Sequence, residues 1–225
     1  MERTKWEKEL REVVSKELFC SAHKMDHIER VYDLCLVLAE GESVNIDVLK
    51  AAALLHDIAR VKEDNDPTGE TDHAKEGAKM AKDILRKKSF PEESVKHVEE
   101  CIISHRYRSN EVAVSKEAKI LFDADKLDNI GAIGVARAFV WVGKNNALIF
   151  NKEDSDDYTK SNLHGGKKGR IKDASKHSPQ MEYETKTKFL IDKMYTKKGR
   201  EMAKERMSFY EDFLNRLEKE IRGEI

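Results

Sequence analysis

Apolar residues recur at helical spacing along almost the whole chain of 225 residues. In the segment 25–40, for example, Val31, Leu34 and Leu38 follow one another at intervals of three and four residues, which places them on one face of a helix. Residues that break helices are scarce, because the chain has only eleven glycines and three prolines. No segment shows the alternation that is typical of a half-buried strand. The pattern predicts an all-α fold.

The apolar spacing and the capping signals together predict where the helices lie. Gly41 fits the C-terminal end of one helix, Asp72 fits an N-cap, and Pro91 fits a first turn. The charged stretch 62–71 contains Pro67 and Gly69 and is expected to be a loop. The expected helices cover residues 6–19, 25–40, 46–58, 73–87, 91–105, 115–127, 130–142, 182–194 and 198–221.

The segment 145–180 interrupts this pattern, since it is rich in Lys, Asp, Ser, Asn and Gly and has no periodicity. The length of the chain fits one domain, spanning residues 1–225. We expect a core at about 20–144, a polar insert at about 145–180 and carboxyl-terminal helices at about 181–222. The insert is either a lid that closes over a polyanion with Lys167, Lys168 and Arg170, or a solvated disordered loop.

The charge balance excludes several classes of protein. Charged residues make up 38% of the chain, and 42 Lys and Arg nearly cancel 43 Asp and Glu, so the formal net charge is −1. A globally basic nucleic-acid binder and a disordered chain of high net charge are therefore not expected. No apolar run is long enough to span a membrane, and the first residues lack the apolar core of a signal peptide. We expect a cytoplasmic protein without a membrane or nucleic-acid partner, and the oligomeric state stays open.

The three cysteines, Cys20, Cys35 and Cys101, are scattered along the chain and form no Cys-x-x-Cys pair. A zinc ribbon or a disulfide framework is therefore not expected. Free cysteines are among the most frequently buried residues, so each is expected to be a small core residue.

Several expected helices carry a histidine or an aspartate on the apolar face. Such a group cannot be buried without a partner, and a shared divalent cation is one economical partner for imidazole and carboxylate groups. One buried histidine alone would more often be hydrogen-bonded within the core, but a set of this size is hard to explain by independent accidents. The set consists of His27, His56 with the adjacent Asp57, His73, His105, Asp125 and Asp128. The other histidines, His23, His97, His164 and His177, are assigned to exposed or loop positions.

The local contexts of these residues resemble the HD-domain phosphohydrolase superfamily. The segments 27–31 (HIERV), 52–58 (AALLHDI) and 123–128 (DADKLD) match the family patterns HxxRV, ALLHDI and DADxLD. The segments 131–139 and 196–206 further resemble a subgroup of small stand-alone bacterial and archaeal HD hydrolases. The resemblance covers roughly residues 20–215 and is weakest in the insert. It implies a helical HD domain with metal-dependent hydrolase activity.

The resemblance also implies roles for individual residues. His27, His56, Asp57 and Asp125 would bind one divalent ion, such as Mn²⁺, Mg²⁺, Ni²⁺, Co²⁺ or Fe. His73 and His105 would either complete a second metal position or lie near the substrate phosphate. Metal-bound water would then attack a phosphoester or phosphoanhydride. The candidates for general acid or base are His73, His105 and Asp128, of which Asp128 has the alternative of only orienting a neighbouring group.

A phosphate substrate also needs positive charge, and the alternative for each candidate cation is an ordinary surface position. The candidates are Arg30, Arg60, Lys62, Lys126 and Arg206. The subgroup implies a nucleotide substrate, with pyrophosphohydrolysis of a nucleoside triphosphate as one reaction and phosphatase or phosphodiesterase activity as others. Tyr107 is the first aromatic residue to consider for base stacking. Two other functions remain open: a di-iron oxygenase of the HD fold, and a non-catalytic module that binds a nucleotide or a partner protein.

Overall fold

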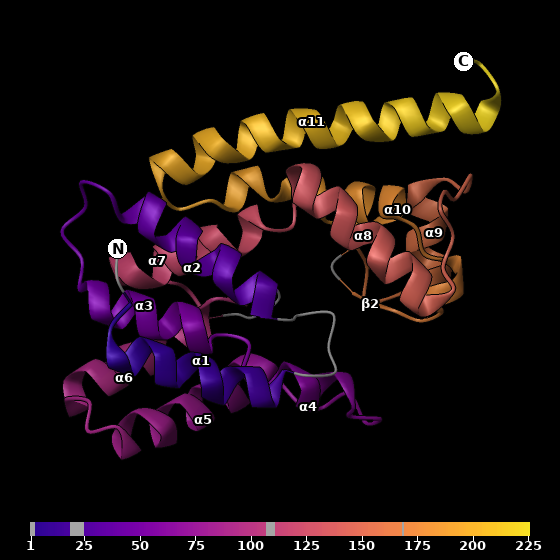
Figure 1. The fold of residues 1–225 in the computed structure, drawn as a ribbon. Helices are drawn as coiled ribbons and strands as arrows, with labels where there is room; N and C mark the ends of the chain where they lie inside the picture. The colour runs from indigo at the N-terminus through magenta and orange to yellow at the C-terminus, as the bar shows by residue number, and fades with distance from the viewer. Residues whose placement is uncertain (1–2, 19–24, 107–110, 168) are drawn as a thin grey trace. The chain divides into compact units, whose positions relative to one another are not determined.

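The computed structural model describes residues 3–18, 25–106, 111–167 and 169–225 (Figure 1). It divides into two compact units, Met1–Asp125 and Lys126–Ile225, which we describe separately. Helices dominate both units, so the predicted all-α class is confirmed. Among the described residues, no helix has both the length and the apolar character needed to cross a membrane. The division into core, insert and carboxyl-terminal helices stays a prediction.

The first unit is built from helices whose bounds lie close to the expected ones. They are α1 Lys5–Glu17, α2 Met25–Ala39, α3 Ile46–Leu55, α4 Arg60–Asp64, α5 His73–Lys87, α6 Glu92–Ser104 and α7 Lys116–Leu127, whose last residues belong to the second unit. The expectation of a loop throughout 62–71 is wrong at its start, because the short helix α4 occupies that position. The sequence shows no apolar face for α4, and none of its residues is fully buried, since each is exposed or intermediate in burial.

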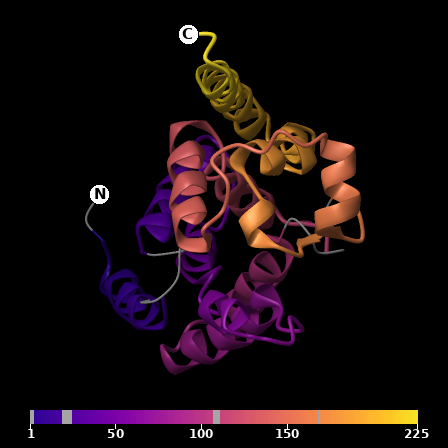
Figure 2. The same cartoon turned by 90° about the vertical axis from the view of Figure 1, so that its right-hand side faces the viewer.

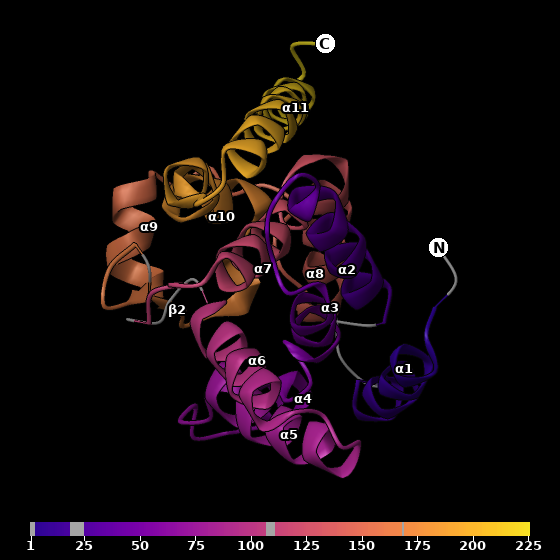
Figure 3. The ribbon, with the colours of Figure 1, turned by 90° about the vertical axis from the view of Figure 1, so that its left-hand side faces the viewer.

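Helix α3 forms the centre of the first unit. Its residues Leu49, Ala52 and Leu55 are fully buried, and the helix packs against α1, α2 and α6. Asn45 caps its start by accepting a hydrogen bond from the backbone of Val48. Helices α5 and α6 run side by side, with α4 next to α5 (Figure 3). This packing brings the C-terminal ends of α3 and α6 close to the start of α5.

A buried carboxylate, Glu7, ties α1 to its neighbours. Its side chain accepts hydrogen bonds from Tyr32 and from the backbone of Thr4, and Lys50 lies 3.6 Å away. Burial by itself would raise the pKa of Glu7, but the hydrogen bonds from Tyr32 and Thr4 outweigh burial and lower the pKa to about 2. The carboxylate form therefore stabilises the folded state.

This shift predicts acid sensitivity. Because the pKa of Glu7 falls from 4.5 to about 2 on folding, its contribution is complete above pH 4.5 and is lost as the pH falls towards 2. Between pH 6 and pH 3 the wild type should lose about 2 kcal/mol more unfolding free energy than Glu7→Gln. Urea denaturation at both pH values measures this difference. Equal losses in the two proteins would contradict the assignment.

The second unit contains four further helices and a minimal hairpin (Figure 2). The antiparallel hairpin pairs Leu163 with Ile171 and His164 with Arg170. The expected helix over 182–194 is wrong, because α10 ends at Thr185 and two 3₁₀ turns follow it. The elements are α8 Gly131–Asn145, α9 Ser155–Asn162, β1 Leu163–His164, β2 Arg170–Ile171, η1 Ala174–Lys176, α10 Pro179–Thr185, η2 Thr187–Phe189, η3 Ile191–Lys193 and α11 Lys197–Arg222.

The insert has a small core of its own. Tyr158 and Met181 are fully buried and pack with Leu163. His177 is only 4% exposed, and its Nδ1 lies 2.6 Å from the Tyr158 hydroxyl. For the described residues of 145–180, the alternative of a solvated disordered loop is therefore wrong. His177 lies in a loop, as one of its two predicted positions had it, but it is buried there and not exposed. Lys168 lies outside the described residues, and a lid role stays a prediction.

The remaining histidines and cysteines largely follow expectation. His164 is exposed, whereas His97 is half-buried, with its Nε2 3.3 Å from a carboxylate oxygen of Glu117. Cys35 and Cys101 are buried core residues, and burial raises the pKa of the Cys101 thiol to about 12. The predictions for Cys20 and His23 lie outside the described residues.

Candidate metal centre

Six of the seven polar residues predicted on the apolar faces, all except Asp128, are buried in the first unit. Each comes from a helix or a helix end whose apolar side packs into the core, so the side chains point inward. The positions are His27 on α2, His56 at the C-cap of α3 with Asp57 after it, His73 at the start of α5, His105 at the C-cap of α6 and Asp125 on α7. All six residues are at most 9% exposed.

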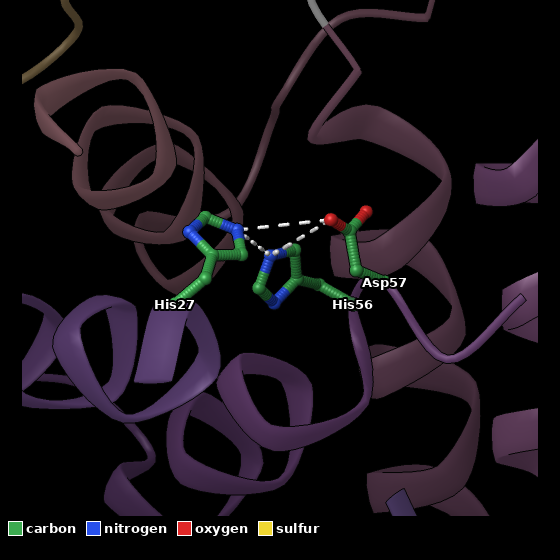
Figure 4. A group of neighbouring side chains, drawn as sticks. All are labelled: His27, His56 and Asp57. Atoms are coloured by element: carbon green, nitrogen blue, oxygen red, sulfur yellow. Dashed lines mark hydrogen bonds and ion pairs between the residues drawn. The ribbon is translucent and has the colours of Figure 1, made fainter. Parts of the chain in front are cut away.

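One group of donor atoms gathers around His27, His56 and one oxygen of Asp57 (Figure 4). The two histidine Nε2 atoms are 3.2 Å apart. Oδ2 of Asp57 lies 3.7 Å from the His27 Nε2 and 3.9 Å from the His56 Nε2. Oδ1 of Asp125 lies 3.5 Å from the same His27 atom. Donor atoms that share one cation at about 2.1 Å are themselves about 3–4 Å apart, so these four residues can hold a divalent ion.

A second group lies around the other oxygen of Asp57. Its Oδ1 is 3.4 Å from the His73 Nε2 and 3.6 Å from the His105 Nε2. The two oxygens of Asp57 therefore face two different pairs of histidines, His27 with His56 and His73 with His105. A carboxylate in this position can bridge two cations.

Hydrogen bonds orient the rings of two histidines. Nδ1 of His56 donates to the carbonyl of Ala53 at 2.8 Å, and Nδ1 of His105 donates to the carbonyl of Ile102 at 2.5 Å. The proton on Nδ1 leaves a lone pair on Nε2, the atom that faces Asp57. Burial also lowers the pKa of His56 to about 4, so this ring is neutral near pH 7 and can act as a ligand.

His73 is oriented differently, by a carboxylate. Its Nδ1 lies 2.6 Å from Oε2 of Glu63, whose side chain is only 12% exposed. Sequence reasoning missed Glu63, because it falls in the stretch that was expected to be a loop and no apolar period marks it. Only the fold of α4 brings it to His73.

The five candidate cations have different surroundings. Nη1 of Arg60 lies 3.2 Å from Nδ1 of His73 and 3.1 Å from Oε2 of Glu63, so this arginine borders the histidine cluster. Arg30 is half-buried and pairs with Asp26 at 2.9 Å. Lys62 is exposed and pairs with Glu76, which fits the surface alternative.

The other two candidate cations, Lys126 and Arg206, lie in the second unit. Arg206 donates to the carbonyl of Leu127 at 2.7 Å and packs over Gly131, where a Cβ atom would meet the Arg206 side chain at 3.1 Å. Lys126 is buried. Asp128 accepts a hydrogen bond from Nη1 of Arg137 at 2.7 Å. Tyr107 lies outside the described residues.

The pair of Asp128 and Arg137 predicts a structural effect. Asp128 is 1% exposed, so removing either partner leaves a poorly compensated charge. We expect Asp128→Ala and Arg137→Ala each to lower the free energy of unfolding by about 3 kcal/mol, and the double variant to cost far less than the sum. Urea denaturation of the four proteins tests this coupling. Additive losses would contradict it.

Comparisons with known proteins agree with this geometry. The family model described as HD domain matches residues 25–130. The uncharacterized protein YpgQ of Bacillus subtilis is 30% identical over 213 residues, which cover 90% of this chain and 86% of YpgQ. The chain belongs to the HD-domain superfamily. Its match to HD-superfamily hydrolases supports a hydrolase at this coarse level.

Two solved structures resemble this member of the superfamily over nearly its full length. Bacillus subtilis YpgQ in complex with ADP has a TM-score of 0.70 at 27% identity, covering 96% of this chain and 95% of that one. A HD-superfamily hydrolase from Bacillus thuringiensis has a TM-score of 0.66 at 27% identity, covering 96% and 94%.

Proposed function

We propose that this HD-domain protein is a divalent-metal-dependent phosphohydrolase that acts on a nucleotide. The observation that carries the proposal is the position of Asp57, whose two oxygens face two buried histidine pairs. Four imidazoles around one carboxylate, with a second carboxylate from Asp125 beside them, form a donor set suited to Mn²⁺, Co²⁺, Ni²⁺ or Fe.

His27, His56, Asp57 and Asp125 would hold the first ion, and His73 with His105 would complete a second position next to Asp57. A bound cation supplies an acidified water and withdraws charge from a phosphoryl oxygen. The protein's own contribution is orientation, because the Nδ1 hydrogen bonds of His56 and His105 keep their Nε2 atoms directed at Asp57.

The residues that bind phosphate and move protons are also part of the proposal. Arg60 is the candidate cation that borders the histidine cluster, and its guanidinium would donate hydrogen bonds to a phosphate oxygen. If only the first ion binds, His73 and His105 are the candidates for general acid or base. For Asp128, the ion pair with Arg137 favours the orienting role over proton transfer. A phosphate-binding role also stays a prediction for Arg30, Lys126 and Arg206.

A nucleotide is the proposed substrate because the similar protein YpgQ has been solved in complex with ADP. ADP joins a base and a sugar to a phosphoanhydride, which is one of the two bond types that this chemistry would cleave. We propose a nucleoside or deoxynucleoside triphosphate as substrate, with cleavage to a monophosphate and pyrophosphate.

A panel of nucleotides tests the function. Nucleoside mono-, di- and triphosphates are incubated with Mn²⁺, Mg²⁺, Co²⁺ or Ni²⁺, and the products are identified by ³¹P NMR. Release of pyrophosphate from triphosphates is the expected result, and release of phosphate alone would replace pyrophosphohydrolysis by phosphatase activity. No product with any metal would contradict the proposal. Consumption of O₂ by the iron-loaded protein would then favour the di-iron alternative.

A further inference from the structure

His73 differs from the other oriented histidines in its place on a helix. His56 and His105 lie at the C-terminal ends of α3 and α6, where the carbonyl three residues earlier can accept the Nδ1 proton. His73 is the first residue of α5, so no preceding turn of the helix offers a carbonyl to it. Its Nδ1 bonds the carboxylate of Glu63 instead, at 2.6 Å.

Glu63 is itself held in place by charged neighbours. Oε1 of Glu63 accepts a hydrogen bond from Arg106 at 2.7 Å, and Oε2 lies 3.1 Å from Arg60. The other end of the Arg106 guanidinium pairs with Asp72 at 2.8 Å. Asp72 is the N-cap of α5 and accepts a hydrogen bond from the backbone of Ala74.

These contacts close a ring. The N-cap Asp72 pairs with Arg106, and Arg106 donates a hydrogen bond to Glu63. Glu63 in turn bonds His73, which directly follows Asp72 in the chain. Glu63 thus contacts the guanidinium groups of Arg60 and Arg106 as well as the His73 ring. Its side chain can accept the Nδ1 proton of His73 as a charge-assisted bond.

We propose that Glu63 is a positioning residue that directs Nε2 of His73 at Oδ1 of Asp57, and that Arg106 and Asp72 hold Glu63 in that role. The inference rests on the metal site of the proposed function. It has a selective consequence. Ion binding at His73, His105 and Asp57 depends on Glu63, whereas binding at His27, His56, Asp57 and Asp125 does not.

Titration of the purified protein with Mn²⁺ alone tests this selectivity. Equilibrium dialysis of the wild type should show two classes of ion. In Glu63→Ala, the Kd of the weaker class should rise by about 10- to 100-fold, while that of the tighter class changes less than about twofold. Glu63→Gln keeps an oxygen that accepts the Nδ1 proton but loses the charge. Its Kd for the weaker class should therefore lie between those of the wild type and Glu63→Ala. Glutamine has the same shape as the native side chain and serves if the alanine variant does not fold.

Glu99→Gln is the matched control. Glu99 is also mostly buried, on α6, and pairs with Lys82 of α5 at 3.1 Å. This substitution removes a carboxylate of similar burial that also pairs with a residue of α5 but lies away from the histidines, and it should leave both classes of Mn²⁺ unchanged.

A double-variant cycle separates positioning from a general loss of structure. If Glu63 acts through His73, then Glu63→Ala should have no further effect on Mn²⁺ binding once His73→Ala is present. The proposal is overturned if Glu63→Ala weakens both classes equally, leaves both unchanged, or adds a loss in the His73→Ala background. It is also overturned if the wild type binds only one ion. Two classes of bound Mn²⁺, of which only the weaker depends on Glu63, in a protein that hydrolyses no nucleotide would contradict the proposed function and leave this inference standing.

Discussion

Asp57→Asn should lower kcat/KM for the nucleotide substrate by about 10³-fold or more. Among the residues that the structure describes, Asp57 alone belongs to both groups of donor atoms, and an amide offers only one oxygen without charge. Metal-derived stabilisation of several kcal/mol would be lost, which corresponds to this factor at 1.36 kcal/mol per tenfold change in rate. Steady-state assays with the metal content measured by mass spectrometry give both quantities.

The control for this variant is Asp33→Asn, which makes the same chemical change at an exposed position on α2. It should keep the activity and the metal content of the wild type. If Asp57→Asn kept more than a tenth of the wild-type rate together with its bound metal, the assignment of Asp57 as the central ligand would be wrong.

Removal of the metal should lower the melting temperature by about 5–10 °C. Without an ion, Asp57 and Asp125 face buried histidine nitrogens at 3.4–3.9 Å with no cation between them. An ion at 100 times its Kd stabilises the folded state by about 2.7 kcal/mol. For a chain of this size each kcal/mol corresponds to about 2–4 °C.

Calorimetric scans in chelator and in excess Mn²⁺ measure this shift. The same pair of scans on Asp57→Asn should show a much smaller difference, because the variant lacks the central ligand. Equal melting temperatures for the chelated and Mn²⁺-loaded wild type would show that these residues bind no ion that matters for folding.

Helix positions were predictable where each segment carries its own signal. The helix that starts at His73 was predicted with its observed bounds, because Asp72 caps it and its apolar face is regular. The prediction of one helix over 182–194 was wrong, because its apolar residues permit a helix but the chain forms 3₁₀ turns after Thr185. The expected exposure of His177 to solvent was wrong for another reason. Its polar neighbours suggested solvent, and only the insert's own core, formed by segments apart in sequence, buries it.

The sequence by itself determined the helical class and the inward positions of His27, His56, His73, His105 and Asp125, because a period of 3.6 residues is a local property that reveals which face is buried. The tertiary structure decided which oxygen of Asp57 faces which histidine pair, and it placed Glu63 on His73. Apart from the contact of Asp57 with its neighbour His56, these relations join residues that lie ten or more positions apart. No local pattern encodes them, since they arise only when α3, α4, α5 and α6 pack together.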